Sequence, residues 1–458
     1  MKPGILSSGT KFTGQANEKA KKLFKERETK TLGELTDYTV LDQYHVSVSG
    51  DNPPPPMKDW SLLNEKIQTA LLNASFSQPT PAQQYGIPCF LSQRAFIMIS
   101  PTGSGKTLAY ALPLLHLLND KPQNELNCII LMPTRELASQ VFRQFIRFSE
   151  ASTVRVQLLR KNRDIPKCQI LIATPKRLID MKPNLTQIEY VVVDEADQLL
   201  SHSFVQQTDQ VFSMLPSNRK LHFSLFTATM MPKVEETAKS FLINPIRIQV
   251  GDDHAVAALI TQELKFVGKE KGKVVEIRQR LNEGSIELPV MIFVSNKQRA
   301  YDLAGELGVP CAVLTSEKSD TERAEAIRMV RTGATQILIT TDLGCRGIDI
   351  AALKTVINFD MPPNSITYIH RIGRTARAGR GGHAITFFTI DDQPYLRPVA
   401  SIMKKSGYEV EDWMLNKMDR KHSGARALYE PMKRHTISSR VWKNAKVRNP
   451  KPKTQILE

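Results

Sequence analysis

The 458-residue sequence predicts an α/β fold made of two doubly wound parallel-sheet domains in tandem, with basic, partly disordered tails. Short apolar runs of strand length alternate with segments of helical length, which is the pattern of a parallel sheet with helical crossovers. This alternation stops at a polar stretch near residue 255 and then starts again. In addition, polar clusters directly follow several of the apolar runs. We therefore expect two domains, and a ligand site at the carboxyl ends of the strands of the first one.

The first domain is expected over residues 57–250. Its strand-length runs are apolar throughout, as expected of strands that are covered on both faces. They lie at 95–99, 128–132, 169–173, 190–194 and 223–226. A helix is expected over 135–148, where the spacing of the apolar residues places four of them on one face. These four are Leu137, Val141, Phe145 and Phe148.

Residues 251–260 are expected to form a linker, and the strand–helix alternation then restarts over 261–412. This second domain has no phosphate-binding loop of its own. Its apolar runs lie at 290–294, 311–314, 336–340, 355–359 and 384–388.

The two ends of the chain differ in composition from the domains. Residues 1–56 are polar and Lys-rich and end in the stiff spacer DNPPPP, so we expect a flexible basic arm, with one helix possible over 17–28. Residues 413–458 hold twelve Lys or Arg against three Asp or Glu, which predicts a basic tail.

The formal net charge of +16 favours a polyanionic partner, most simply nucleic acid, although a basic solubilising surface is the alternative. Five cysteines without metal-ligand spacing suit a reducing compartment. No apolar run approaches the roughly 18 residues of a membrane span, and the N-terminus lacks the apolar segment of a signal peptide. We expect an intracellular, soluble protein that does not bind membranes, with a monomer as its oligomeric state.

The stretch SPTGSGKT, residues 100–107, predicts a phosphate-binding loop between a strand and a helix. Its glycines allow successive backbone N–H groups to point into one concavity. Lys106 would reach the β- and γ-phosphates of a nucleotide, and the Thr107 hydroxyl would bind Mg²⁺. The alternative is an ordinary Gly-Ser turn. The residues expected to hold the phosphates are Thr102, Gly103, Ser104, Gly105, Lys106 and Thr107.

Two carboxylates stand at the end of the buried run 190–194, in the stretch DEAD. Asp194 is expected to hold Mg²⁺, partly through water, and Glu195 to orient and deprotonate the attacking water. The alternative is a strand end with solvated acids. Polar clusters also follow the other runs of the first domain, which indicates one shared site at this edge of the sheet.

Seven stretches of the sequence resemble, in their order and spacing, the motifs of the DEAD-box RNA helicase family. They are SPTGSGKT, PTRELA, TPKRL, DEAD, TAT, RGID and HRIGRTARAGR, within residues 76–395. The resemblance implies two RecA-like domains that close over ATP and a single RNA strand.

The resemblance also implies roles at the nucleotide. Gln83 would read the adenine edge, with Trp60 as the aromatic candidate upstream, and Gly347 and Asp349 would lie at the ribose. Arg374 and Arg377 would act as arginine fingers on the γ-phosphate. His370 would connect the second domain to the DEAD strand end and to TAT. The residues implied in that coupling are Asp197, Thr227 and Thr229.

The RNA contacts implied by the family address phosphates and sugars rather than bases, so they position the strand without reading its sequence. The RNA 2′-hydroxyl would distinguish RNA from DNA. The residues are Thr134, Arg135, Thr174, Pro175, Arg177, Arg323 and Thr341.

Three further stretches, 262–273, 387–407 and 431–440, resemble the family branch that acts in pre-ribosomal RNA processing for the small subunit. The expected function is therefore an ATP- and Mg²⁺-dependent RNA helicase that unwinds short duplexes in ribosome biogenesis, in the nucleus and nucleolus. Two alternatives stay open: an ATP-gated RNA clamp within an assembly, and a DNA-dependent motor. For the segment HRIGRTARAGR alone, a basic patch without catalytic duty is the alternative.

Overall fold

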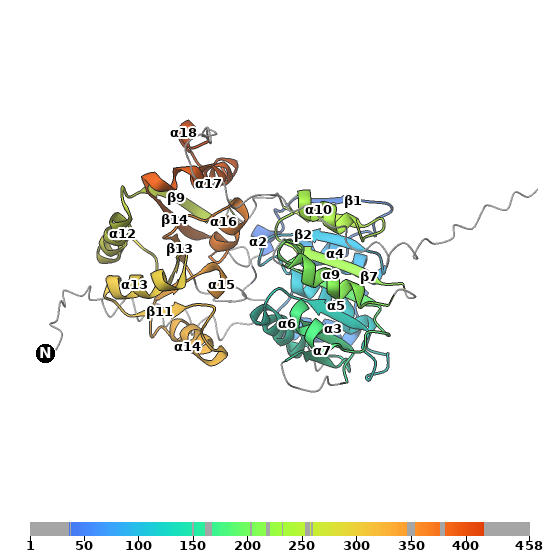
Figure 1. Cartoon of the computed structure of the whole chain (residues 1–458). Helices are drawn as coiled ribbons and strands as arrows, with labels where there is room; N and C mark the ends of the chain where they lie inside the picture. The colour runs from blue at the N-terminus through green and yellow to red at the C-terminus, as the bar shows by residue number, and fades with distance from the viewer. Residues whose placement is uncertain are drawn as a thin grey trace, which may run out of the picture.

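The structure of the chain is a computed structural model. It describes residues 36, 38–148, 151–160, 167–201, 204–216, 220–230, 232–251, 257, 260–345, 353–375 and 381–415. Two sheets with helices on their faces form two lobes that lie side by side (Figure 1). The predicted fold class is confirmed.

The first sheet has eight strands in the order β1-β8-β2-β7-β6-β3-β5-β4. Every pairing in it is parallel except that of β1 with β8. The strands are β1 Val46–Ser49, β2 Phe96–Ile99, β3 Cys128–Leu131, β4 Val156–Leu158, β5 Ile170–Ala173, β6 Tyr190–Asp194, β7 His222–Thr227 and β8 Ile246–Val250.

Helices of the first domain cover both faces of this sheet. They are α2 Tyr38–Leu41, α3 Glu65–Asn73, α4 Pro81–Leu91, α5 Lys106–Leu117, α6 Arg135–Arg147, α7 Pro175–Met181, α8 Ala196–Leu199, α9 Val205–Ser213 and α10 Pro232–Lys239, with the 3-10 turn η1 at Trp60–Leu62. Because side chains alternate along a strand, β2 contributes to two cores. Phe96 and Met98 pack on one face of the sheet and Ile97 and Ile99 on the other.

The second sheet has six strands in the order β11-β12-β10-β13-β14-β9, and all of its pairings are parallel. The strands are β9 Ile260–Phe266, β10 Val290–Phe293, β11 Cys311–Leu314, β12 Ile337–Thr340, β13 Thr355–Asn358 and β14 Gly382–Phe388. Its helices are α12 Glu270–Glu283, α13 Lys297–Leu307, α14 Asp320–Arg331, α15 Asp342–Cys345, α16 Ser365–Ile372, α17 Gln393–Lys405 and α18 Asp412–Leu415, with the 3-10 turn η3 at Ile390–Asp392.

Part of the predicted N-terminal arm is folded, so the prediction of a flexible arm over the whole of 1–56 is wrong for its last third. Residues 38–41 form α2, and β1 pairs with β8 through the register Val46 to Val250. Val46 and Val48 alternate with serines, which lets one side of the strand pack on the first core while the other faces outward. The possible helix at 17–28 lies outside the described residues.

Four strands were not expected from the sequence, namely β1, β4, β8 and β9. In β8 the burial alternates along IRIQV, and in β9 Ile260 and Gln262 are buried while most of the other residues are half-buried. Such strands lack the continuous apolar run that marks a strand covered on both faces. The helix expected over 135–148 is present as α6, and Val141, Phe145 and Phe148 of its predicted apolar face are buried.

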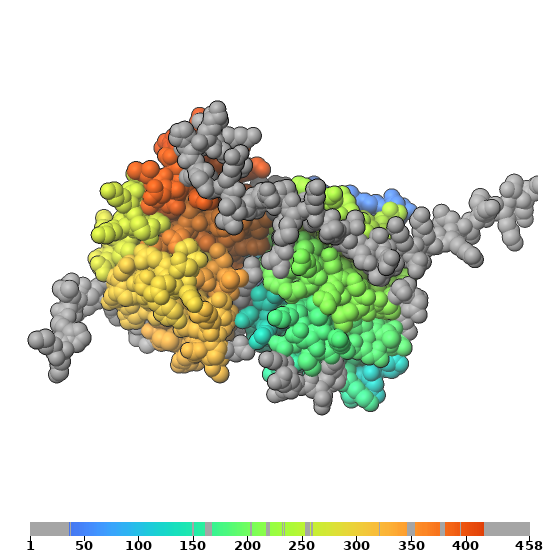
Figure 2. All heavy atoms as spheres, in the orientation of Figure 1, coloured from blue at the N-terminus to red at the C-terminus, as the bar shows by residue number. Residues whose placement is uncertain are grey.

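The two lobes lie against each other (Figure 2). Ion pairs join them at Glu136 and Asp197, which follow the carboxyl ends of β3 and β6 of the first sheet. Among the described residues, no helix has both the length and the hydropathy needed to cross a membrane.

Candidate active site

The phosphate-binding loop lies between β2 and α5, as its sequence predicts. Gly103 and Gly105 have φ angles of 83° and 94°, a left-handed backbone that glycine adopts without steric cost. Gly105 is the residue directly before α5, so the free N–H groups of the first helical turn open onto the loop. This arrangement of N–H groups and helix dipole suits an anion such as a phosphate group.

The loop is held from behind by the start of α4. The Thr80 hydroxyl donates to the carbonyl of Ser104 at 2.6 Å, and Gln83 Nε2 donates to the carbonyl of Gly105 at 3.3 Å. Gln83 Oε1 in turn accepts from the Thr80 N–H at 2.9 Å. The side chain of Gln83 therefore lies against the phosphate loop, with both of its polar atoms bonded, and its reading of adenine stays a prediction.

Lys106 is buried beside its own loop. Its Nζ donates to the carbonyls of Ser100 and Pro101, the latter at 3.1 Å. Burial lowers the pKa of Lys106, and the carboxylates of Glu195, Asp194 and Asp197 oppose that shift. These three acids are close enough to act on the lysine, so the loop and the DEAD strand end form one site.

Asp194 is the last residue of β6, and two donors hold its carboxylate. Tyr110 Oη donates to Oδ2 at 2.8 Å, and the N–H of Glu195 donates to Oδ1 at 2.9 Å. Burial and the neighbouring charge of Glu195 raise the pKa of Asp194 to about 6, while Lys106 and Tyr110 act in the opposite direction. Glu195 itself has a φ of 52°, an unusual left-handed conformation for a residue with a side chain.

Asp197 links the DEAD strand end to the stretch TAT after β7. Its Oδ2 accepts from the Thr229 hydroxyl at 2.6 Å, and its N–H donates to Thr227 Oγ1 at 3.4 Å. Thr227 Oγ1 also donates to the carbonyl of Thr229 at 2.8 Å. The structure thus brings together the three residues of the first domain that the family resemblance implies in coupling.

His370, at the end of α16 in the second domain, reaches across to this group. Its Nε2 lies 3.3 Å from Asp197 Oδ2, an ion-pair distance, although no hydrogen bond of good geometry is formed. Burial disfavours the imidazolium, but Asp197 and Glu195 outweigh it and raise the pKa of His370, against the opposing charge of Arg374. Arg374 therefore lies close to His370. The predicted positions Arg377, Gly347 and Asp349 lie outside the described residues.

Metal-ligating atoms of Glu195, Asp197 and His370 also lie within 4.8 Å of one another. By distance these three could hold a cation. However, Asp197 already pairs with His370 and Thr229, whereas the predicted Mg²⁺ ligands are Thr107 and Asp194. Thr107 lies in the first turn of α5, and Asp194 is the last residue of β6.

The predicted RNA contacts of the first domain gather at two helix N-termini. Thr134 caps α6, with its hydroxyl accepting from the N–H of Leu137 at 3.3 Å, and Arg135 beside it is exposed. Thr174 precedes α7, which begins with the buried Pro175, and Arg177 is partly exposed. Because β3 and β5 are adjacent parallel strands, both helix starts lie at one edge of the sheet.

The two second-domain residues that were predicted to contact RNA, Arg323 and Thr341, are buried, whereas a residue must be exposed to contact RNA. Arg323 in α14 is only 6% exposed; its guanidinium donates to the carbonyls of Thr315 and Gly344, each at 3.1 Å. It also pairs with Glu136 of the first domain at 3.0 Å. Thr341 is likewise buried, and its hydroxyl accepts from the N–H of Gly344 at 3.1 Å. In this structure Arg323 therefore connects the two domains rather than facing outward.

Three residues have contacts that the sequence did not indicate. Trp60, the aromatic candidate for the adenine, lies in the first core with its Nε1 donating to the carbonyl of Phe76. Tyr110 contacts Asp194, and nothing in a helix after a phosphate loop signals such a bond. Arg371 forms a bidentate pair with Asp342 at 2.7 and 2.8 Å and also donates to the carbonyl of Asp360.

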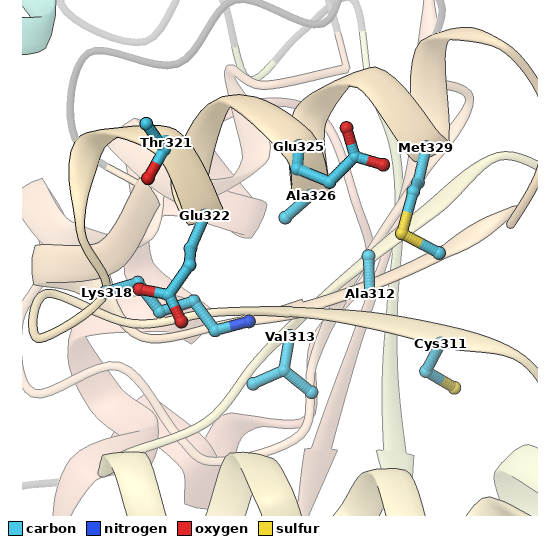
Figure 3. A pocket seen from close by; sticks show the side chains of 9 residues that line it. All are labelled: Cys311, Ala312, Val313, Lys318, Thr321, Glu322, Glu325, Ala326 and Met329. Atoms are coloured by element: carbon cyan, nitrogen blue, oxygen red, sulfur yellow. The ribbon is translucent and has the colours of Figure 1, made fainter.

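A pocket of about 430 Å³ lies elsewhere, between α14 and the edge strand β11 of the second domain (Figure 3). Its lining residues do not include any of the predicted site residues. They are Cys311, Ala312, Val313, Lys318, Thr321, Glu322, Glu325, Ala326 and Met329. The site is therefore identified by the convergence of its side chains rather than by this cavity.

The donor set of the loop fits a nucleotide phosphate with Mg²⁺. Thr102 Oγ1 is buried and has no hydrogen-bond partner within the described residues, so it is available to an oxygen ligand. An added Cβ at Gly105 would overlap Gln83 Nε2 and lie 2.8 Å from Thr80 Oγ1, so the backbone is in close contact with α4. Hydroxyl and carboxylate oxygens, as in Thr107 and Asp194, are the ligands that Mg²⁺ prefers.

Comparisons with known proteins agree with this geometry. The family model described as DEAD/DEAH box helicase matches residues 80–237, and that described as helicase conserved C-terminal domain matches residues 272–379. The chain is 40% identical over 399 residues to the probable ATP-dependent RNA helicase ddx52 of Dictyostelium discoideum, covering 82% of this chain and 59% of that protein. It is 37% identical over 428 residues to the ATP-dependent RNA helicase ROK1 of Meyerozyma guilliermondii, covering 87% of this chain and 79% of the relative.

Among solved structures, the chain resembles Saccharomyces cerevisiae Dbp5 bound to RNA and ADP BeF3. The TM-score is 0.69 at 28% sequence identity, over 77% of this chain and 94% of the other. The matched models cover strands β2 to β7 of the first sheet and β10 to β13 of the second, and the two relatives extend over most of the described chain. The chain therefore belongs to the DEAD-box family of ATP-dependent RNA helicases.

Proposed function

We propose that this protein is an RNA-dependent ATPase that uses Mg²⁺ and ATP to bind RNA and locally unwind short duplexes in ribosome biogenesis. The observation that carries the proposal is the contact of His370 with Asp197, 3.3 Å across the two domains and beside the phosphate loop. A group from the second domain thus reaches the DEAD strand end, where Lys106, Asp194 and Glu195 converge.

Bound Mg·ATP supplies the phosphoryl group and its charge, and the chain supplies binding, orientation and proton transfer. The Lys106 ammonium and the N–H groups at the start of α5 bind phosphate oxygens. Thr107 and Asp194 would hold the Mg²⁺ ion. The Glu195 carboxylate orients water and accepts its proton, at a carboxylate oxygen next to the fixed Asp194.

Arg374 and Arg377 stabilise the charge that develops on the γ-phosphate, as arginine residues supplied from a second domain do in phosphoryl transfer. Arg374 lies close to His370, so the pairing of His370 with Asp197 supports this role for Arg374. Hydrolysis is then possible only when the domains are together, which couples turnover to RNA binding on both of them.

RNA contacts are assigned to the α6 and α7 starts of the first domain, through Thr134, Arg135 and Arg177. Arg323 takes part through its pairing with Glu136, beside Arg135. The similarity to ddx52 and ROK1 supports a place in ribosome biogenesis. Pre-ribosomal RNA as the substrate and the nucleolus as the location are proposed from the family resemblance of stretches 262–273, 387–407 and 431–440.

The test is steady-state ATPase activity of the full chain without nucleic acid, with single-stranded RNA, and with DNA of the same sequence, at one salt concentration. We expect stimulation by RNA alone and loss of at least a hundredfold in turnover for Glu195→Gln, roughly the contribution of a positioned general base. Equal stimulation by DNA, or wild-type turnover in Glu195→Gln, contradicts the proposal. Long RNA retention in ATP without strand separation would instead support an RNA clamp.

A further inference from the structure

Tyr110 places a polar group inside the first core. It lies in α5, one helical turn after Thr107, and its side chain is fully buried. Its ring packs edge-on against Phe226 of β7, with ring centroids 4.9 Å apart. A phenylalanine would fill the same space, so the packing of the ring does not require the hydroxyl.

A buried hydroxyl is unfavourable unless it finds a partner. The partner here is the carboxylate of Asp194, which accepts from Tyr110 Oη at 2.8 Å. The Thr107 side chain is also close enough to influence the pKa of the Tyr110 phenol. The hydroxyl thus contacts one of the two residues that are proposed to hold Mg²⁺ and lies near the other.

The bond has a geometric consequence for Asp194. Its Oδ1 accepts from the N–H of Glu195 at 2.9 Å, and its Oδ2 accepts from Tyr110. With one donor on each oxygen, the plane of the carboxylate is fixed, and each oxygen keeps a further lone pair for water or a cation. Without Tyr110, the backbone N–H of Glu195 is the one hydrogen-bond donor left to this carboxylate within the described residues, and rotation about the Cβ–Cγ bond is less restricted.

We infer that Tyr110 is a positioning residue that fixes the Asp194 carboxylate in the orientation that binds the Mg²⁺ of Mg·ATP. Groups that hold a metal ligand in place commonly change metal affinity when they are removed, without touching the metal. This inference rests on the proposed function, since it assigns Mg·ATP to this site.

The variant is Tyr110→Phe, which removes only the hydroxyl. The matched control is Tyr190→Phe, in β6 and in the same domain. Tyr190 is also buried, and its hydroxyl accepts from Gln93 Nε2 at 3.0 Å, away from Asp194. Both variants delete the hydroxyl of a buried tyrosine and one side-chain hydrogen bond, so a purely structural effect should appear in both.

The measurement is the binding of a fluorescent, non-hydrolysable ATP analogue to the full chain without RNA, in EDTA and across a Mg²⁺ titration. We expect Tyr110→Phe to bind the analogue in EDTA within twofold of wild type. The Mg²⁺ concentration that gives half of the maximal Mg²⁺-dependent change in analogue binding should rise about tenfold in Tyr110→Phe, at the lower end of the range for loss of a group that holds a metal ligand. In Tyr190→Phe this concentration should stay at the wild-type value.

The outcomes separate the inference from the proposed function. A wild-type chain whose analogue binding does not depend on Mg²⁺ overturns both. Wild-type binding that is strengthened by Mg²⁺, with the same Mg²⁺ dependence in Tyr110→Phe, overturns the positioning role alone. An equal shift in both variants also overturns it, because loss of a buried hydroxyl then explains the effect.

Discussion

Replacement of Gly105 by alanine tests whether the shape of the phosphate loop controls nucleotide binding. Gly105 has a φ of 94°, and an added Cβ would overlap Gln83 Nε2. The left-handed backbone costs an L-residue about 1–2 kcal/mol. Displacing the Gln83 amide also breaks its hydrogen bonds to Gly105 O and the Thr80 N–H, at about 1 kcal/mol each.

The native loop conformation should therefore become about 3 kcal/mol less favourable in Gly105→Ala. The variant can relieve this strain by leaving that conformation, and binding of nucleotide must then restore it. We expect the dissociation constant for an ATP analogue to rise on the order of a hundredfold, because about 1.4 kcal/mol corresponds to a factor of ten. Equilibrium fluorescence titration of the full chain measures it.

Gly284→Ala is the control for backbone strain alone. Gly284 ends α12 with a φ of 69°, and an added Cβ there would meet no atom within 4 Å. The Gly284→Ala variant should lower the melting temperature of the second domain without changing nucleotide affinity. If Gly105→Ala binds the analogue within threefold of wild type, the close contact between the loop and α4 does not govern binding, and the reasoning fails.

Two further predictions concern contacts of the second domain. Contact between the domains should depend on pH, because the pKa of His370 is raised by its pairing with Asp197. The stabilisation from this pairing is fully present below the ordinary histidine pKa of about 6.5, and it is lost as the pH rises through the raised pKa. Fluorescence energy transfer between the domains should fall on alkalinisation, and an unchanged profile in His370→Gln would contradict this. Arg371→Met should destabilise the second domain by about 3 kcal/mol in denaturant unfolding, because it strips partners from buried Asn358 and from Asp342. Arg328→Met, which removes an exposed pair with Glu325, is the control and should have little effect; an equal loss in both would argue against a special role for the buried arginine.

Much of this fold was predictable because its information is local. A strand covered on both faces must be apolar at every position, so runs such as 128–132 and 290–294 mark interior strands of the two sheets. Strands with one open face, including β8 and β9, mix polar and apolar residues and were missed. The phosphate loop was predictable for the same reason, since its left-handed glycines are neighbours in the chain.

What the sequence alone determined is thus the content of the site: a loop that can bind phosphate, carboxylates at a strand end, and a basic segment in a second domain. Only the tertiary structure decided which of these side chains meet. The pairing of Arg323 with Glu136 and that of Tyr110 with Asp194 each join residues far apart in the chain. The pairing of His370 with Asp197 does so too, and before the structure it was expected from the family resemblance alone. Spacing along the chain carries no record of such contacts, because they depend on how sheets and lobes pack, and packing fixes positions through many weak interactions at once.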